Sequence, residues 1–161
     1  PIADEIIVTA NQPAGYEFLN LRLVSDLKPG RGALGGLYTA VASASSPLVA
    51  VVACDMPMIR AALLAEQVRL LQADEADVVI PVGADGWEPL HAVYRREACL
   101  PPVKTALETG QRRMISWFEH VKVRRMEREE IQRFDPLEQS FLNVNTPEEF
   151  ARAEALARAG D

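Results

Sequence analysis

The stretch from Leu48 to Pro57 constrains the fold more than any other part of the chain. It reads Leu-Val-Ala-Val-Val-Ala-Cys-Asp-Met-Pro, an unbroken apolar run that ends in a carboxylate and a proline. Such a run is typical of a central strand buried on both faces, as in a parallel sheet covered by helices. Asp55 should therefore lie at the carboxyl edge of a sheet, where open α/β sheets bind ligands. The simpler role of a turn former or helix cap fits its position equally well.

Length, charge and cysteine content restrict the class of protein. The 161 residues predict a single domain over residues 1–161. A net charge of −6, from 23 acidic and 17 basic residues, argues against nucleic acid or an anionic membrane as a partner. Cys54 and Cys99 lack the spacing of metal ligands, and Cys54 falls in the expected core. Together with the absence of a membrane-length apolar run, this favours a protein of the reducing cytoplasm.

Strand patterns alternate with helix patterns along the whole chain. Pro101-Pro102 is expected to begin one of the helices, and a capping box at Thr146 and Glu149 to begin another. The alternation predicts an α/β fold, with a mostly parallel sheet in a three-layer α/β/α arrangement. Strands are expected over 5–10, 21–25, 48–53, 77–82, 87–95 and 121–125, and helices over 34–41, 60–73, 98–108 and 146–158.

A glycine-rich loop over residues 26–36 leads into the first helix pattern. Its glycines would let backbone N–H groups approach a phosphate or a base. Gly30, Gly32 and Gly35 match G-x-G-x-x-G, which suggests a nicotinamide-dependent enzyme as a minor alternative. That motif should follow its strand in a tight turn, whereas Lys28 and Pro29 intervene here. A loop that only turns the chain is the simpler interpretation.

Other polar residues stand where a site could form. Asn11 follows the first expected strand, and Asn143 and Asn145 alternate in an extended segment before the last helix. Arg112 and Arg113 could together hold a phosphate. Each also has an ordinary structural role, as a turn former, a cap support or a solvated basic surface.

Taken in order, these motifs resemble those of the molybdenum cofactor guanylyltransferases (MobA), a family of nucleotidyltransferases similar to nucleotide-sugar pyrophosphorylases. The resemblance covers nearly the whole chain. It is carried by Ile-Val-Thr-Ala-Asn at 7–11, the loop at 26–36, Ala-Cys-Asp-Met-Pro at 53–57, Glu-Pro-Leu-His-Ala-Val-Tyr at 88–94, Gly-Gln-Arg-Arg at 110–113 and Phe-Leu-Asn-Val-Asn-Thr-Pro-Glu-Glu at 141–149.

The resemblance implies a Rossmann-like nucleotidyltransferase fold and a specific reaction. A molybdopterin phosphate would attack the α-phosphate of GTP, so that GMP is transferred and pyrophosphate leaves. Magnesium would be the cofactor, and molybdoenzyme-maturation proteins would be potential partners. Asp55 would hold the metal and serve catalysis. The other implied contacts are Asn11, Asp26, Gly32, Leu34 and Gly35 for the nucleotide, and Arg112, Arg113, Asn143 and Asn145 for molybdopterin.

The chain departs from the family pattern at its start. The family's first strand and its glycine-rich phosphate loop with a lysine are not found in the sequence. We therefore expect the natural polypeptide to be longer at its N-terminus and this chain alone to be inactive. Three alternatives stay open: a cytidylyl- or sugar-phosphate nucleotidyltransferase of the same fold, a nicotinamide-dependent oxidoreductase, and a non-catalytic nucleotide-binding domain.

Overall fold

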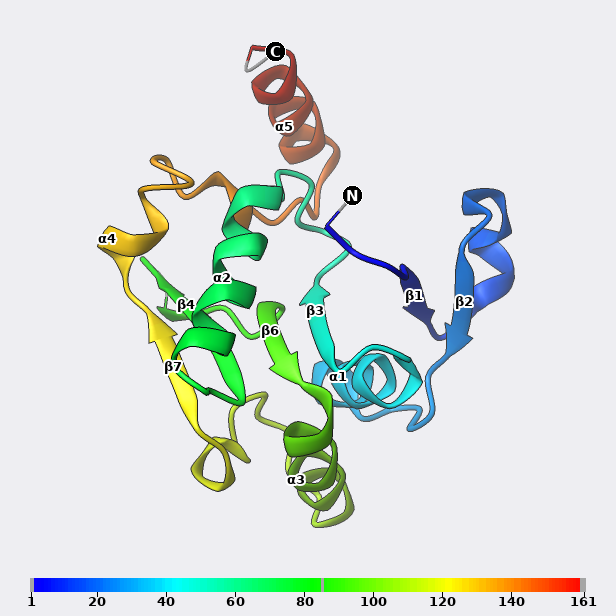
Figure 1. The fold of residues 1–161 in the computed structure, drawn as a ribbon. Coiled ribbons are helices and arrows are strands. Elements are labelled where there is room, and N and C mark those ends of the chain that lie inside the picture. The colour runs from blue at the N-terminus through cyan, green and yellow to red at the C-terminus, as the bar shows by residue number, and fades with distance from the viewer. Residues whose placement is uncertain (1, 85, 160–161) are drawn as a thin grey trace.

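The computed structural model describes residues 2–84 and 86–159, which form two sheets with helices packed around them (Figure 1). Among these residues no helix combines the length and the apolar character needed to cross a bilayer. The strands are β1 (Ile7–Ala10), β2 (Arg22–Ser25), β3 (Leu48–Val52), β4 (Val78–Gly83), β5 (Gly86–Trp87), β6 (His91–Arg95) and β7 (Val123–Met126). The α-helices are α1 (Gly32–Ser43), α2 (Ala61–Ala73), α3 (Arg96–Glu108), α4 (Arg128–Ile131) and α5 (Pro147–Ala159), and the short 3₁₀ helices are η1 (Pro13–Leu19), η2 (Phe118–His120) and η3 (Gln139–Phe141).

The larger sheet has five strands, in the order β3-β6-β4-β5, with β7 also paired to β4. β4 and β7 are parallel, whereas β6 runs antiparallel to both β3 and β4. Strands β3, β4 and β7 therefore share one direction, as expected for this fold class. The reversed β6 between β3 and β4 makes the sheet mixed, a feature that the strand pattern did not predict.

β3 lies at the end of this sheet, so its predicted place as a central strand buried on both faces is wrong. β6 pairs with one edge of β3, and no described residue pairs with the other. Val49 and Val51 face the core, but Ala50 is exposed and Val52 is 39% exposed. A run of small apolar residues shows neither how many strands will pair with it nor whether other elements will cover both of its faces.

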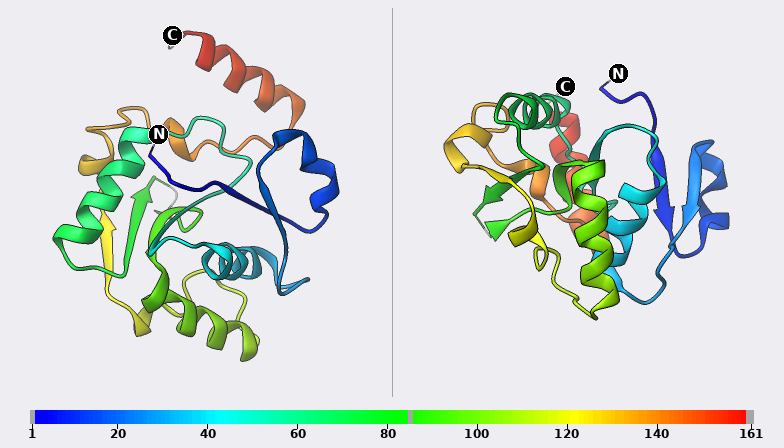
Figure 2. Two further views of the ribbon diagram at one scale, coloured as in Figure 1. Left: turned by 45° about the vertical axis from the view of Figure 1, so that its right-hand side comes forward. Right: turned by 60° about the horizontal axis from the view of Figure 1, so that its bottom comes forward.

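β1 and β2 form a separate parallel pair, which α1 connects to the larger sheet by packing against β1, β2 and β3 (Figures 1 and 2). Glu5, just before β1, accepts hydrogen bonds from Arg22 at 2.6 Å and from the Ser45 hydroxyl at 2.7 Å. These bonds lower the pKa of Glu5 to about 2. A cleft of about 330 Å³, lined by residues that include Ile7 and Leu48, lies between the two sheets.

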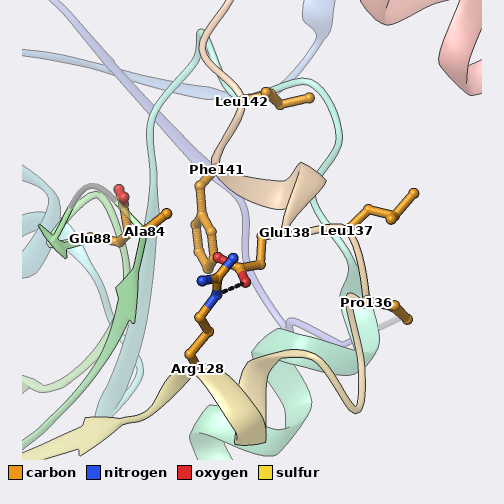
Figure 3. A pocket seen from close by; sticks show the side chains of 8 residues that line it. All are labelled: Ala84, Glu88, Arg128, Pro136, Leu137, Glu138, Phe141 and Leu142. Atoms are coloured by element: carbon orange, nitrogen blue, oxygen red, sulfur yellow. Dashed lines mark hydrogen bonds and ion pairs between the residues drawn. The ribbon is translucent and has the colours of Figure 1, made fainter.

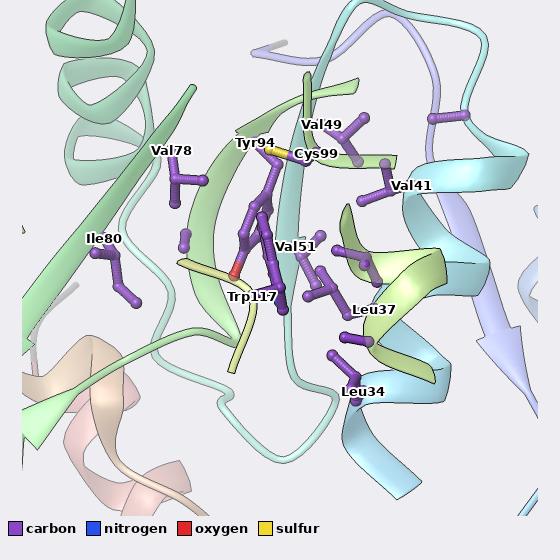
Figure 4. Packing of buried hydrophobic residues seen from close by; sticks show 14 of the residues in the cluster. Leu34, Leu37, Val41, Val49, Val51, Val78, Ile80, Tyr94, Cys99 and Trp117 are labelled. Atoms are coloured by element: carbon purple, nitrogen blue, oxygen red, sulfur yellow. The ribbon is translucent and has the colours of Figure 1, made fainter. Parts of the chain in front are cut away.

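Helices cover both faces of the larger sheet, which confirms the three-layer α/β/α arrangement. On one face α1 and α3 bury an apolar cluster against β3, β4 and β6 (Figure 4). On the other face α2 and α4 bury a second cluster. β6 contributes to both, because Ala92 and Tyr94 belong to the first cluster and Val93 to the second. The single strand that was expected over residues 87–95 is divided in the structure, because the chain turns between β5 and β6.

Two helix starts were predicted from capping signals, and one prediction holds. The expected start of α3 at Pro101-Pro102 is wrong, because α3 begins at Arg96 and contains both prolines. Arg96 directly follows β6, and its N–H donates to the carbonyl of Pro47 at 2.9 Å. The capping box of α5 is confirmed, since Glu149 N–H donates to Thr146 Oγ1 at 3.2 Å and Thr146 N–H donates to Glu149 Oε2 at 3.0 Å.

Candidate active site

Asp55 lies in a tight turn directly after β3. The N–H of Met56 donates to the carbonyl of Ala53 at 3.3 Å and closes this turn. Met56 is buried and anchors the turn, while Asp55 is half-buried and keeps access to solvent. Cys54 was expected in the core, but it is exposed because β3 ends at Val52 and the chain turns outward. Asp55 is therefore a carboxylate at the carboxyl end of a strand, as predicted.

A backbone hydrogen bond connects the Asp55 turn to a segment far along the chain. The N–H of Val144 donates to the carbonyl of Asp55 at 2.8 Å. Asn143 and Asn145 stand on either side of Val144, and both are exposed. The structure thus brings the Asn143–Asn145 segment, which we call the amide arm, next to the predicted metal-binding carboxylate.

The far end of the amide arm is attached to α5. Glu149 Oε2 accepts the N–H of Asn145 at 2.8 Å as well as that of Thr146. These backbone hydrogen bonds lower the pKa of Glu149, so the carboxylate that holds the arm is charged at neutral pH. The amide arm is therefore held at Val144 by the Asp55 turn and at Asn145 by the first turn of α5.

Asn11 and Asp26 form a second group, at the carboxyl edge of the small sheet. Ala10 and Ser25 are register partners at the ends of the parallel strands β1 and β2. Asn11 and Asp26 come directly after them, and so they leave the sheet at the same edge. No hydrogen bond between described residues joins this group to the Asp55 turn.

The Asp26 carboxylate holds the glycine-rich loop against α1. Asp26 Oδ1 accepts the N–H of Lys28 at 2.9 Å and lies 2.8 Å from the hydroxyl of Thr39. Thr39 is fully buried; its hydroxyl accepts the N–H of Leu27 at 3.0 Å and also lies 2.9 Å from the carbonyl of Gly35. Sequence reasoning missed Thr39, although its position one helical turn after Gly35 places the two on one face of α1.

Gly35 is required for this close packing. A Cβ atom there would lie 2.9 Å from Arg31 Cβ and 3.1 Å from the Lys28 carbonyl oxygen, closer than side chains normally approach. Gly32, the first residue of α1, has a φ of +62°, a conformation that favours glycine. Leu34 is fully buried in the core, so any contact that it makes with a nucleotide would come from its main chain.

Replacing Thr39 with valine should lower the free energy of unfolding by about 1–3 kcal/mol, because the fully buried Thr39 hydroxyl is lost and the N–H of Leu27 loses its acceptor. Urea unfolding of both proteins would measure the change. Thr109→Val is the control: Thr109 is exposed, its hydroxyl donates to Thr105 O at 2.9 Å, and its loss should cost less than about 0.5 kcal/mol. A Thr39→Val protein as stable as the wild type would exclude the proposed role of Thr39 in holding the loop.

Arg112 and Arg113 are not brought to the amide arm. They follow the C-terminal end of α3, and both are exposed. Figures 1 and 2 place that end of α3 at the opposite end of the molecule from α5. The role of this pair on the molybdopterin side stays a prediction from the resemblance.

The residues around Asp55 fit magnesium only if a substrate supplies further ligands. Among the described residues, no three His, Cys, Asp or Glu side chains gather in a way that could hold a metal ion. Mg²⁺ is commonly bound by one or two carboxylates, while substrate phosphates and water complete its shell. Asp55, partly accessible to solvent, matches this type of site.

A surface hollow of about 400 Å³ lies next to the amide arm (Figure 3). Phe141 and Leu142, which lead into the arm, line it together with the ion pair between Arg128 and Glu138. This ion pair lowers the pKa of Glu138, although partial burial acts in the opposite direction. The wall of the hollow and the amide arm are therefore parts of one continuous segment.

Comparisons of sequence relate the chain to one family of transferases. A family model described as "MobA-like NTP transferase domain" matches residues 1–125. The "Molybdenum cofactor guanylyltransferase" of Desulfosudis oleivorans is 33% identical over 159 residues, covering 99% of this chain and 78% of the relative. The "Probable molybdenum cofactor guanylyltransferase" of Chloroflexus aggregans is 33% identical over 162 residues, which cover 96% of this chain and 74% of the relative.

Solved structures show the same relation at the level of the fold. The "Molybdopterin-guanine dinucleotide biosynthesis protein A" of Archaeoglobus fulgidus superposes with a TM-score of 0.79 at 26% identity, over 95% of this chain and 78% of that one. The 2-C-methyl-D-erythritol 4-phosphate cytidylyltransferase of Thermus thermophilus superposes with a TM-score of 0.68 over 97% of this chain and 83% of that one. At 18% identity this likeness shows a shared fold alone. Since the family model spans most of the residues and the guanylyltransferases match almost all of them, the chain belongs to the family of MobA-like NTP transferases.

Proposed function

We propose that this protein transfers GMP from GTP to the phosphate of molybdopterin, which gives a guanine dinucleotide cofactor and pyrophosphate. The observation that carries the proposal is the pairing of Asp55 with the amide arm through the Val144 hydrogen bond. It supports a site in which the Asp55 carboxylate would bind a metal–triphosphate complex and the two exposed amides of the arm would donate hydrogen bonds to the acceptor phosphate.

The reaction needs positioning and charge neutralisation rather than a covalent nucleophile. An oxygen of the acceptor phosphate would form a bond to the α-phosphorus of GTP, and the bond from that phosphorus to the bridging oxygen of the leaving pyrophosphate would break. Asp55 would hold magnesium, which supplies positive charge to the reacting phosphates. Asn143 and Asn145 would orient the acceptor.

The nucleotide side of the site is proposed at the glycine-rich loop. Asn11 and Asp26 share one edge of the small sheet. Gly32 and Gly35 lie in the first turn of α1, where the free N–H groups of a helix favour an anion such as a phosphate. Thr39 keeps this loop in place through Leu27 and Asp26. The main-chain groups of the loop that would bind the nucleotide are thus already held in position before the nucleotide arrives.

The reaction is tested by incubating the enzyme with GTP labelled in its α-phosphate, molybdopterin and magnesium. Label should appear in a molybdopterin guanine dinucleotide, and one pyrophosphate should be released for each dinucleotide formed. Release of label as GMP without any dinucleotide, or no dependence on molybdopterin, would contradict the proposal.

The enzyme should bind GTP more tightly than CTP, because the Gly-Ala-Leu-Gly-Gly loop at 32–36 resembles the guanylyl branch of these transferases. Titration calorimetry with each nucleotide in the presence of magnesium measures the difference. ATP is the control: it is also a purine nucleotide, but its base has different hydrogen-bond donors and acceptors from those of guanine. Equal or tighter binding of CTP would instead favour a cytidylyltransferase, which has the same fold.

No feature of the described residues favours the nicotinamide-dependent alternative. The G-x-G-x-x-G match starts at Gly30 and not in a tight turn at the end of β2, which ends at Ser25, and the chain falls in a family of transferases. A cytoplasmic location and contacts with molybdoenzyme-maturation proteins remain parts of the proposal that rest on the resemblance.

A further inference from the structure

The amide arm has a buried support that the sequence did not reveal. We infer that Asp135 and His91 form a clamp that positions the amide arm beside Asp55, and that they thereby set the affinity for the acceptor substrate. The inference rests on the proposed function for the identity of the acceptor. It depends on three contacts, which lie at residues 135, 141 and 144.

Asp135 is the first part of the clamp. Its side chain is fully buried, between α4 and η3. One carboxylate oxygen accepts the N–H of Ser140 at 2.7 Å, and the other accepts from Arg60 Nε at 3.1 Å. Arg60 immediately precedes α2 and ends the connection that contains the Asp55 turn. A single carboxylate thus joins that connection to the segment that becomes the amide arm.

His91 is the second part of the clamp. Its ring meets the ring of Phe141 edge-on, with centroids 5.1 Å apart and an interplanar angle of 79°. Gln67 of α2 holds His91 from the other side, because its Nε2 lies 3.3 Å from Nδ1 and donates to the His91 carbonyl at 3.2 Å. Burial lowers the pKa of His91, although the charge of Asp135 raises it. A neutral imidazole is therefore available to pack against the phenyl ring.

The third contact is the hydrogen bond from Val144 to Asp55. Between the anchors at Ser140, Phe141 and Val144 the chain is too short to move freely, so the position of Asn143 follows from them. Figure 3 shows Phe141 and Leu142 at the edge of the hollow, with the chain continuing toward the arm. Since a misplacement of about 1 Å can cost about 10² in rate, loosening this segment should affect the acceptor more than the nucleotide.

Two variants test the clamp. Asp135→Asn keeps the shape of the side chain but replaces one of its two acceptor oxygens with a donor. Phe141→Leu keeps an apolar side chain and removes the aromatic contact with His91. Glu66→Gln is the control, because Glu66 also pairs with an arginine, Arg69 at 2.7 Å, but in an ion pair within α2 that includes neither a residue of the clamp nor one of the amide arm.

Steady-state assays should show the KM for molybdopterin raised about tenfold in both variants, with the KM for GTP within about twofold of the wild type. Glu66→Gln should leave both values unchanged. A merely structural role would lower the melting temperature and the amount of active enzyme but leave the KM for molybdopterin unaltered. That result, or an equal rise in both KM values, would overturn the inference.

A measurement without catalysis separates the clamp from the proposed function. The N–H of Val144 should exchange slowly with deuterium in the wild type and at least about tenfold faster in both Asp135→Asn and Phe141→Leu, because the segment that carries Val144 is no longer held against the Asp55 carbonyl. If the natural wild-type protein transfers no GMP but exchange changes in this way, the reaction is wrong and the clamp is right. Unchanged exchange in both variants would overturn the clamp whatever the reaction.

Discussion

Replacing Asp55 with asparagine in the natural protein should lower kcat for guanylyl transfer by about 10²–10³ while leaving the melting temperature nearly unchanged. An amide keeps the shape of the side chain but loses the negative charge that binds magnesium. Higher magnesium concentrations should restore only part of the lost kcat. Thermal melting of both proteins, together with guanylyl transfer at several magnesium concentrations, measures the two effects.

Cys54→Ser is the matched control for this substitution. Cys54 is in the same turn and exposed, so its replacement tests whether any change in the turn lowers the rate. We expect kcat within about twofold of the wild type, in line with the small effects of surface substitutions. If Asp55 only forms the turn or caps a helix, Asp55→Asn would behave like this control, since asparagine caps helices as well as aspartate does. Near wild-type turnover of Asp55→Asn would thus remove Asp55 from the metal site.

Replacing Leu37 with alanine should lower the free energy of unfolding by about 2–5 kcal/mol. Leu37 is 1% exposed, on the face of α1 that packs in the first core cluster against β3 (Figure 4). Its truncation loses the transfer free energy of the missing carbons and leaves a cavity between rigid elements. In a chain of this size the melting temperature should fall by about 2–4 °C for each kcal/mol.

Leu137→Ala is the control for the core substitution. Leu137 is 74% exposed, so the same chemical change should alter the free energy of unfolding by less than about 0.5 kcal/mol. Urea unfolding followed by tryptophan fluorescence suits both variants, because Trp117 is buried in the first cluster. Equal losses in the two proteins would mean that the described core does not carry the stability of the fold.

The local elements could be read from the sequence because their signals are local. Apolar periodicity located β4 and α2 to within a residue, and the capping box located the start of α5, whereas the strand expected over 87–95 is interrupted between β5 and β6. The start of α3 was missed because two prolines resemble a helix start, whereas α3 begins at Arg96, directly after β6, and contains both prolines. The end of β6 is set by its pairing with β3, which is far away in sequence, so no local pattern predicts it.

The candidate site was predictable only in part, for the same reason. Asp55 and the Asn143–Asn145 segment each stood out, as a carboxylate after an apolar run and as alternating amides before a capping box. Their proximity comes from one backbone hydrogen bond, and a backbone N–H has no signature in the side-chain sequence. Asp135 left no signal at all, because a lone aspartate in a polar stretch resembles any turn residue.

The sequence by itself determined the class of the fold, the bounds of most of its elements and the polar residues that end its strands. Those properties depend on burial and hydrogen bonding within a few residues along the chain. Only the tertiary structure decided that β3 lies at the end of a mixed sheet, that Thr39 supports the glycine-rich loop, and that the amide arm reaches Asp55 while Arg112 and Arg113 lie elsewhere. Which elements become neighbours depends on how whole faces of helices and sheets pack against one another. The free energy of that packing comes from contacts between residues that are far apart in the sequence.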